Sequence, residues 1–121
     1  RTRERMDEGM RRVIIESPYA GDVERNLRYL RACLRDSLLR GEAPFASHGL
    51  YTQPGVLDDH DPEQRRLGIE AGFAWWWGTE AVVFYEDLGW SPGMKVALEL
   101  AAKRCEDTEV RCIGRRWEDG A

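Results

Sequence analysis

Short apolar runs alternate with amphipathic segments along this chain of 121 residues. Residues 13–15 form one apolar run. Residues 81–85 are apolar at every position, which is typical of a strand buried on both faces of a parallel sheet. Weaker strands are predicted at residues 43–46 and 110–113. The hydrophobic pattern therefore predicts four strands, of which the first and the third in chain order are the clearest.

Between these runs, apolar residues recur every three or four positions, which is the spacing of an amphipathic helix. Each such segment starts with an Asp or a Ser that can cap a helix, and in two of them Pro follows directly. The predicted helices cover residues 22–41, 61–77 and 91–105. Residues 47–61 contain Gly, Pro and three Asp, and they are predicted to form a long loop.

The alternation of strands and helices predicts a parallel sheet with helices on both faces. We expect an α/β fold, a small Rossmann-like or flavodoxin-like three-layer sandwich with a parallel sheet of four to five strands in the order 2-1-3-4. The length is that of one domain, expected over residues 11–121. Residues 1–10 are charged and lack periodicity, and we expect them to form a frayed arm.

Composition then excludes several classes of function. The net charge of −4 argues against binding to duplex nucleic acid. No apolar run could span a membrane and no signal peptide is recognisable, so a soluble, cytoplasmic protein without a membrane partner is expected. The three cysteines lack the spacing of a zinc site, and Cys33 and Cys105 are expected to be buried, inert thiols. His60 stands among three Asp and is expected to be salt-paired rather than to bind a metal.

Three consecutive tryptophans, Trp75, Trp76 and Trp77, fall at the end of the second predicted helix. On a helix they would span about 200° of its surface, so they cannot all face one core. At least one is expected at a subunit interface or in a ligand site, and we expect a homodimer or a higher homo-oligomer. An interaction module that binds another protein through these rings is an alternative.

The candidate binding residues follow the predicted strands. In open α/β sheets, ligands bind beyond the carboxyl ends of the strands, near the point where the strand order reverses. We therefore expect one binding rim. The candidates on it are Ser17, Pro18, Tyr19, Asp22, His48, Tyr51, Glu86, Asp87, Ser91, Gly93 and Met94.

Each chemical role has a plain structural alternative. Free N–H groups after Ser91 suit a phosphate, but Ser91 also fits an ordinary N-cap. His48 could act as an acid, a base or an anion ligand, or could simply be solvated. Glu86 or Asp87 could bind a ribose hydroxyl or act as a base. Neither G-x-G-x-x-G nor a P-loop motif is present, and we expect no cofactor and no metal.

Three segments resemble nucleoside 2-deoxyribosyltransferase-like proteins. Residues 13–19, with Asn26 one turn into the next helix, are similar to the first strand–helix unit of that superfamily. Residues 82–87, followed by Ser-Pro-Gly-Met at 91–94, are similar to its second signature. The segment 44–52 resembles a subgroup of small, largely uncharacterised and often phage-encoded members.

The resemblance implies cleavage of an N-glycosidic bond, with transfer of the deoxyribosyl group to another base or to water. It also implies a nucleophilic Glu and an Asp on two helices, where this chain has Ala97 and Gly72. Glu99 is two residues from the nucleophile position, on another face of the helix, and it has the spacing of an ion pair with Lys95 and Lys103.

Two functions stay open. The first is an N-glycosidic bond hydrolase or deoxyribosyltransferase-like enzyme acting on a nucleoside or nucleotide. The alternative is a non-catalytic binder of a nucleotide-derived ligand, in the cytoplasm (the host's, if phage-encoded). In the enzyme, Ser17, Tyr19, Ser91 and Gly93 would form the sugar and phosphate pocket, Asp87, Glu86 or Glu99 would supply the carboxylate, and His48 and Tyr51 would shape the base side.

Overall fold

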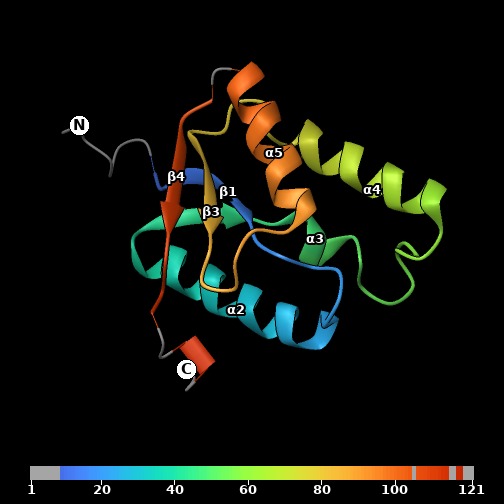
Figure 1. The fold of residues 1–121 in the computed structure, drawn as a ribbon. Helices are drawn as coiled ribbons and strands as arrows, with labels where there is room; N and C mark the ends of the chain where they lie inside the picture. Colours follow the sequence, from blue (N-terminus) through green and yellow to red (C-terminus); the bar gives the residue numbers. More distant parts are fainter. Residues whose placement is uncertain (1–8, 105, 115–116, 119–121) are drawn as a thin grey trace.

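The computed structural model describes residues 9–104, 106–114 and 117–118, and it shows an α/β fold with one parallel sheet (Figure 1). The strands are β1 (Arg11–Glu16), β2 (Glu42–Phe45), β3 (Ala81–Tyr85) and β4 (Thr108–Arg111). The helices among the described residues are α2 (Val23–Leu39), α3 (Ser47–Leu50), α4 (Pro62–Ala74) and α5 (Pro92–Lys103). The sheet order is β2-β1-β3-β4, so the predicted small Rossmann-like or flavodoxin-like fold is confirmed. Most of the expected frayed arm, residues 1–8, lies outside the described residues. Cys105, which was expected to be buried, lies outside them too.

The three predicted N-caps are confirmed, and they explain where the helices start. Asp22 accepts a hydrogen bond from the Arg25 N–H at 3.2 Å. Asp61 caps α4 and Ser91 caps α5 in the same way, each with Pro directly after the cap.

Side chains of the two central strands alternate between two cores. On one face, Val13 and Ile15 of β1 pack against α2. On the other face, Ile14 of β1 lies with β3 side chains under α5. That second core consists of Ile14, Trp76, Val82, Phe84, Met94, Ala97 and Ala101. Figure 1 shows α2 and α5 on opposite sides of the sheet. β1 and β3 pair in parallel, so their carboxyl ends lie side by side.

The last strand lies two residues earlier than predicted. β4 covers Thr108–Arg111 rather than residues 110–113. It is an edge strand, and Val110 points outward with 53% of its surface exposed, while the charged Arg111 is buried. The apolar residue of this strand is therefore not the one that faces the protein interior.

Two predictions about the middle of the chain are wrong in part. The expected loop at residues 47–61 begins with the short helix α3, although the rest is turns. Helix α4 ends at Ala74, three residues before the predicted end, and the tryptophans lie in the turn that follows. Because this turn is not helical, the three tryptophans do not spread over about 200° of a helix surface as predicted. Trp76 is buried in the α5-side core, whereas 59% of Trp75 and 90% of Trp77 is exposed.

A buried ion pair joins the two outer strands. The Arg111 guanidinium donates to both carboxylate oxygens of Glu42, with Nη1 2.9 Å from Oε1 and Nη2 2.7 Å from Oε2. Ser37 of α2 donates to the same carboxylate at 2.8 Å. Burial opposes the charge on Glu42, but these hydrogen bonds and the positive charge of Arg111 outweigh it and lower the pKa of Glu42. Both carboxylate oxygens of the buried Glu42 therefore have hydrogen-bond donors.

Candidate functional site

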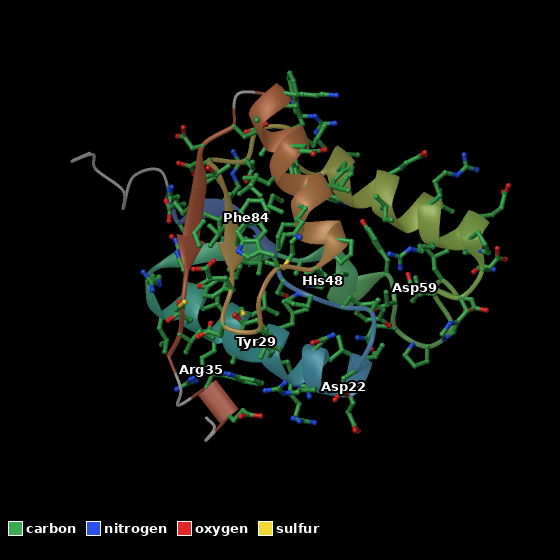
Figure 2. All side chains as sticks on the ribbon, in the orientation of Figure 1. Asp22, Tyr29, Arg35, His48, Asp59 and Phe84 are labelled. Atoms are coloured by element: carbon green, nitrogen blue, oxygen red, sulfur yellow. The ribbon has the colours of Figure 1, made fainter. Side chains whose placement is uncertain are left out.

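A hydrogen bond links the ends of the first two strands. Ser17 follows β1, His48 lies on α3 directly after β2, and Ser17 Oγ is 2.8 Å from His48 Nε2. Burial lowers the pKa of His48 to about 4, so the imidazole is neutral at neutral pH. Figure 2 shows His48 at the same end of the sheet as Tyr29. His48 is therefore half-buried and bonded, not a solvated loop histidine.

The polar residues after β1 hold the shape of its loop. The buried Asn26 side chain donates to the carbonyl oxygens of Tyr19 and Ala20, at 2.9 and 3.1 Å. Pro18 is buried, and the Asp22 carboxylate is occupied by its capping bond. Of this predicted group, Ser17 and the half-buried Tyr19 are the residues whose side chains are not used to build the loop.

Asp87, one of the predicted catalytic residues, has a structural role. Its carboxylate accepts hydrogen bonds from the Tyr29 hydroxyl and from the backbone N–H groups of Ile113 and Gly114. Although burial raises the pKa of Asp87, these bonds lower it further than burial raises it. A carboxylate held by three donors is a weak base, so Asp87 is poorly suited to activate water.

Glu86 is also engaged. Its Oε1 accepts a hydrogen bond from Trp90 Nε1 at 2.8 Å, and the Trp90 ring stacks on Phe84 with 5.0 Å between ring centroids. Figure 2 shows Phe84 on β3, within the layer that α5 covers. Glu86 thus fixes the indole that closes one end of the α5-side core.

The start of α5 fits the capping interpretation of Ser91. Ser91 Oγ accepts from the Met94 N–H at 3.2 Å, and the Ser91 N–H contacts Met94 Sδ at 3.5 Å. Met94 is 1% exposed in the core, so its side chain presents almost no surface at the rim. Gly93 is exposed, and its backbone stays available to a ligand.

The structure does not bring Glu99 to this rim. Glu99 is exposed on α5, as are Lys95 and Lys103, and no ion pair joins the three within the described residues. Ala97, where the resemblance implies a nucleophile, is 1% exposed. Glu99 is therefore a surface residue.

Gly72 lies where the resemblance implies an Asp, and there is no room for a side chain. A Cβ built on Gly72 would lie 2.7 Å from Ser47 Cβ, closer than real Cβ atoms approach other carbons. α4 and α3 thus pack through this glycine. A carboxylate could not replace it without moving one of the two helices.

Tyr51 faces the exposed tryptophan rather than the Ser17–His48 pair. Its hydroxyl accepts from Trp75 Nε1 at 2.8 Å, and its ring and that of Trp75 both pack against Phe45. The hydrogen bond positions Trp75 beside β2. Tyr51 therefore shapes an aromatic surface next to the rim.

Sequence reasoning missed Glu16, the last residue of β1. Alternation places it on the same sheet face as Ile14, and the sheet register pairs it with Phe84. Burial raises the pKa of Glu16 to about 8, and no hydrogen bond or ion pair engages its side chain in the described part of the chain. The sequence did contain a signal for this residue, because Glu16 is a charged residue directly after the apolar run at residues 13–15.

No group of three or more His, Cys, Asp or Glu side chains in the described ranges could hold a metal ion. The backbone N–H of His60 donates to Asp58 at 2.9 Å, and the carboxylate of Asp59 pairs with Arg65. Figure 2 shows Asp59 on the loop that leads into α4, away from His48. Within the same ranges, no helix is long and apolar enough to cross a membrane.

A comparison with models of protein families gives a match. The model of a protein family described as a domain of unknown function (DUF7768) matches residues 11–111, from the first residue of β1 to the last of β4. A search of the curated proteins found no match. A search of the solved structures found no match either.

Proposed function

Because the chain belongs to the family of domains of unknown function DUF7768, whose description names no activity, we propose a function from the site itself. We propose that the domain binds a nucleoside or nucleotide beyond the carboxyl ends of β1 and β3 and hydrolyses its N-glycosidic bond. The observation that carries this proposal is the 2.8 Å contact between Ser17 and His48, which joins the segments after β1 and β2. It gives the rim a polar pair where ligands of such sheets bind.

The resemblance to nucleoside 2-deoxyribosyltransferase-like proteins supports the substrate class. Ser17 and Tyr19 lie in the segment that carries that resemblance, and the exposed backbone at Gly93 offers N–H groups for a phosphate at the start of α5. Under this proposal, Ser17, Tyr19 and Gly93 contact the sugar and phosphate, and His48 lies on the base side.

Hydrolysis fits this chain better than transfer does. Transfer through a covalent intermediate needs a carboxylate nucleophile. The position where the resemblance implies that nucleophile is the buried Ala97, and Glu99 points to solvent. Water is then the acceptor that the site can use, because direct attack by water needs no enzyme nucleophile.

The test is incubation of the purified chain with a panel of nucleosides and nucleoside 5′-monophosphates, followed by chromatography for free base. A second base is added in parallel reactions. We expect release of free base without base exchange, and His48→Ala should lower the rate while His60→Ala, at the other histidine, should not. Exchange as fast as release would refute the preference for hydrolysis, and neither release nor exchange with any compound would refute the enzyme.

One observation favours a non-catalytic binder as the second candidate. Asp87 and Glu86 are both occupied by structural hydrogen bonds, which removes two of the three carboxylates predicted to act. A binder should show a higher melting temperature with nucleotide, no base release, and unchanged binding in Glu86→Gln. A panel without any thermal shift would remove this candidate.

The expected cytoplasmic location and homodimer belong to the same proposal. The described cysteines, Cys33 and Cys112, are free, as in a reducing compartment. The exposed rings of Trp75 and Trp77 offer apolar surface for a second copy. Light scattering on the purified chain measures the oligomeric state, and a monomeric mass would refute the dimer.

A further inference from the structure

Glu16 has a half-buried side chain for which the described residues supply no partner. It ends β1, one residue before Ser17, whose hydroxyl contacts His48. Neither an N–H nor a cation engages the Glu16 side chain in the described residues, in contrast to Asp87 and Glu86. An unsatisfied carboxyl group at a strand end costs stability, which suggests that it is kept for a ligand.

The surroundings of Glu16 are apolar. The residues that share its sheet face include Ile14 on the same strand and Phe84 at the paired position of β3. α5 covers this face with Met94 and Ala97. In such surroundings a carboxyl group keeps its proton, and burial raises the pKa of Glu16 to about 8.

Among the described residues, no charged neighbour opposes this protonation. The titratable groups that other elements bring to this end of the sheet are His48 on α3 and Glu86 and Asp87 after β3, and none of them contributes to the shift at Glu16. The charged residues of α5, among them Lys95, are exposed on its outer surface. Desolvation is thus the sole cause of the shift.

We propose that Glu16, at the end of β1, is the catalytic residue that protonates the departing base. This inference rests on the proposed N-glycosidic hydrolysis and assigns its general acid. As the bond between C1′ and the base nitrogen breaks, the electron pair stays with the base, and the Glu16 proton moves to the base. A water oxygen bonds to C1′ and loses one proton to solvent, from which Glu16 regains one. The products are the free base and the sugar with a hydroxyl group at C1′.

The experiment compares two leaving groups in the wild-type chain and in Glu16→Gln. One substrate is the nucleoside or monophosphate from which the wild type releases base fastest. The other is p-nitrophenyl 2-deoxyriboside, or its 5′-phosphate, whose phenolate leaves without being protonated. Glu63→Gln, at an exposed carboxylate in the first turn of α4, is the matched control. Circular dichroism and melting curves establish that each variant is folded.

We expect Glu16→Gln to lower kcat for base release about 100-fold or more, since general acid catalysis contributes on the order of 10²–10⁴-fold. The same variant should retain cleavage of the nitrophenyl substrate within about 5-fold, because that step needs no acid. The wild-type rate of base release should fall as the pH rises through about 8, while that of the nitrophenyl substrate should not.

The outcomes separate this inference from the function on which it rests. A wild type that releases base, with Glu16→Gln equally active or equally impaired on both substrates, refutes the role of Glu16 and leaves hydrolysis standing. A wild type that cleaves no substrate refutes both. A loss confined to base release supports Glu16 as the acid, because a merely structural role would impair both reactions.

Discussion

Tyr29 and Asp87 hold each other through two hydrogen bonds, although they are 58 residues apart in the chain. The Tyr29 hydroxyl donates to Asp87 Oδ1 at 2.6 Å and accepts from the Asp87 N–H at 2.8 Å. The same carboxylate receives the N–H groups of Ile113 and Gly114, so it connects α2, the end of β3 and the segment after β4. Asp87, which its position after β3 suggested as a site residue, thus holds three segments of the fold together.

Asp87→Asn should therefore destabilise the fold. The amide replaces one acceptor oxygen with a donor that faces backbone N–H groups, and we expect the free energy of unfolding to fall by about 2–3 kcal/mol. Urea denaturation measures the change. Tyr29→Phe should cost about 1–2 kcal/mol, and the double variant should cost less than the sum of both. Strict additivity would contradict the mutual dependence of the two residues.

Glu16 should make the protein less stable as the pH rises. Its folded pKa of about 8 lies above that of an unfolded Glu, so the folded chain binds more protons between about pH 4.5 and 8. Stability is lost across that window and is constant above it. Glu16→Gln should be more stable than the wild type by about 1–3 kcal/mol at pH 8, with no gain at pH 4. Denaturation at each pH in both proteins measures the difference, and a pH-independent difference would show that Glu16 ionises normally.

His48 should have the opposite effect on acidification. Its folded pKa of about 4 lies below that of an unfolded His, so the unfolded chain takes up the proton first. The wild type should lose about 2 kcal/mol between pH 6.5 and 4 through this group. His48→Gln should lack that loss, whereas His60→Gln, at an exposed histidine, should show the same loss as the wild type. Parallel curves for all three proteins would contradict the burial of His48.

Gly72→Ala should destabilise the contact between α4 and α3. Alanine normally stabilises a helix relative to glycine by about 0.5–1 kcal/mol. Here, however, the new Cβ would meet the Ser47 side chain, with 2.7 Å to Ser47 Cβ, and we expect a net loss of about 1–3 kcal/mol. Gly68→Ala, one turn earlier and next to the flexible end of Leu57, is the control and should change stability little. Recovery of stability in the double variant Ser47→Gly with Gly72→Ala would identify the clash as the cause.

The fold was predictable because its central features are local. The uniformly apolar β3 and the caps Asp22, Asp61 and Ser91 are visible within a few residues of sequence. Alternation and right-handed crossovers leave few strand orders, and the predicted one is among them. The position of the edge strand β4 was predicted wrongly because its apolar residue Val110 is exposed and its charged residue Arg111 is buried.

The candidate site was less predictable because it depends on contacts distant in sequence. The convergence of Ser17 with His48 followed from strand-end rules, but nothing near Asp87 indicates that Tyr29 will occupy it. The environment of Glu16 likewise depends on α5, about 80 residues further along the chain. Position along a strand thus predicted which residues gather at the rim, but not which of them keep free polar atoms.

The bond between Arg111 and Glu42 has a consequence for folding on the ribosome. The two residues are 69 positions apart, and Arg111 lies in β4, the last strand in chain order among the described residues. Until β4 emerges, the guanidinium available to Glu42 is that of Arg11 on β1, which donates to Glu42 Oε2 at 3.0 Å, and the two bonds from Arg111 are missing. The charge of Glu42 is thus compensated in two stages during synthesis, first by a residue of β1 and then by a residue of β4.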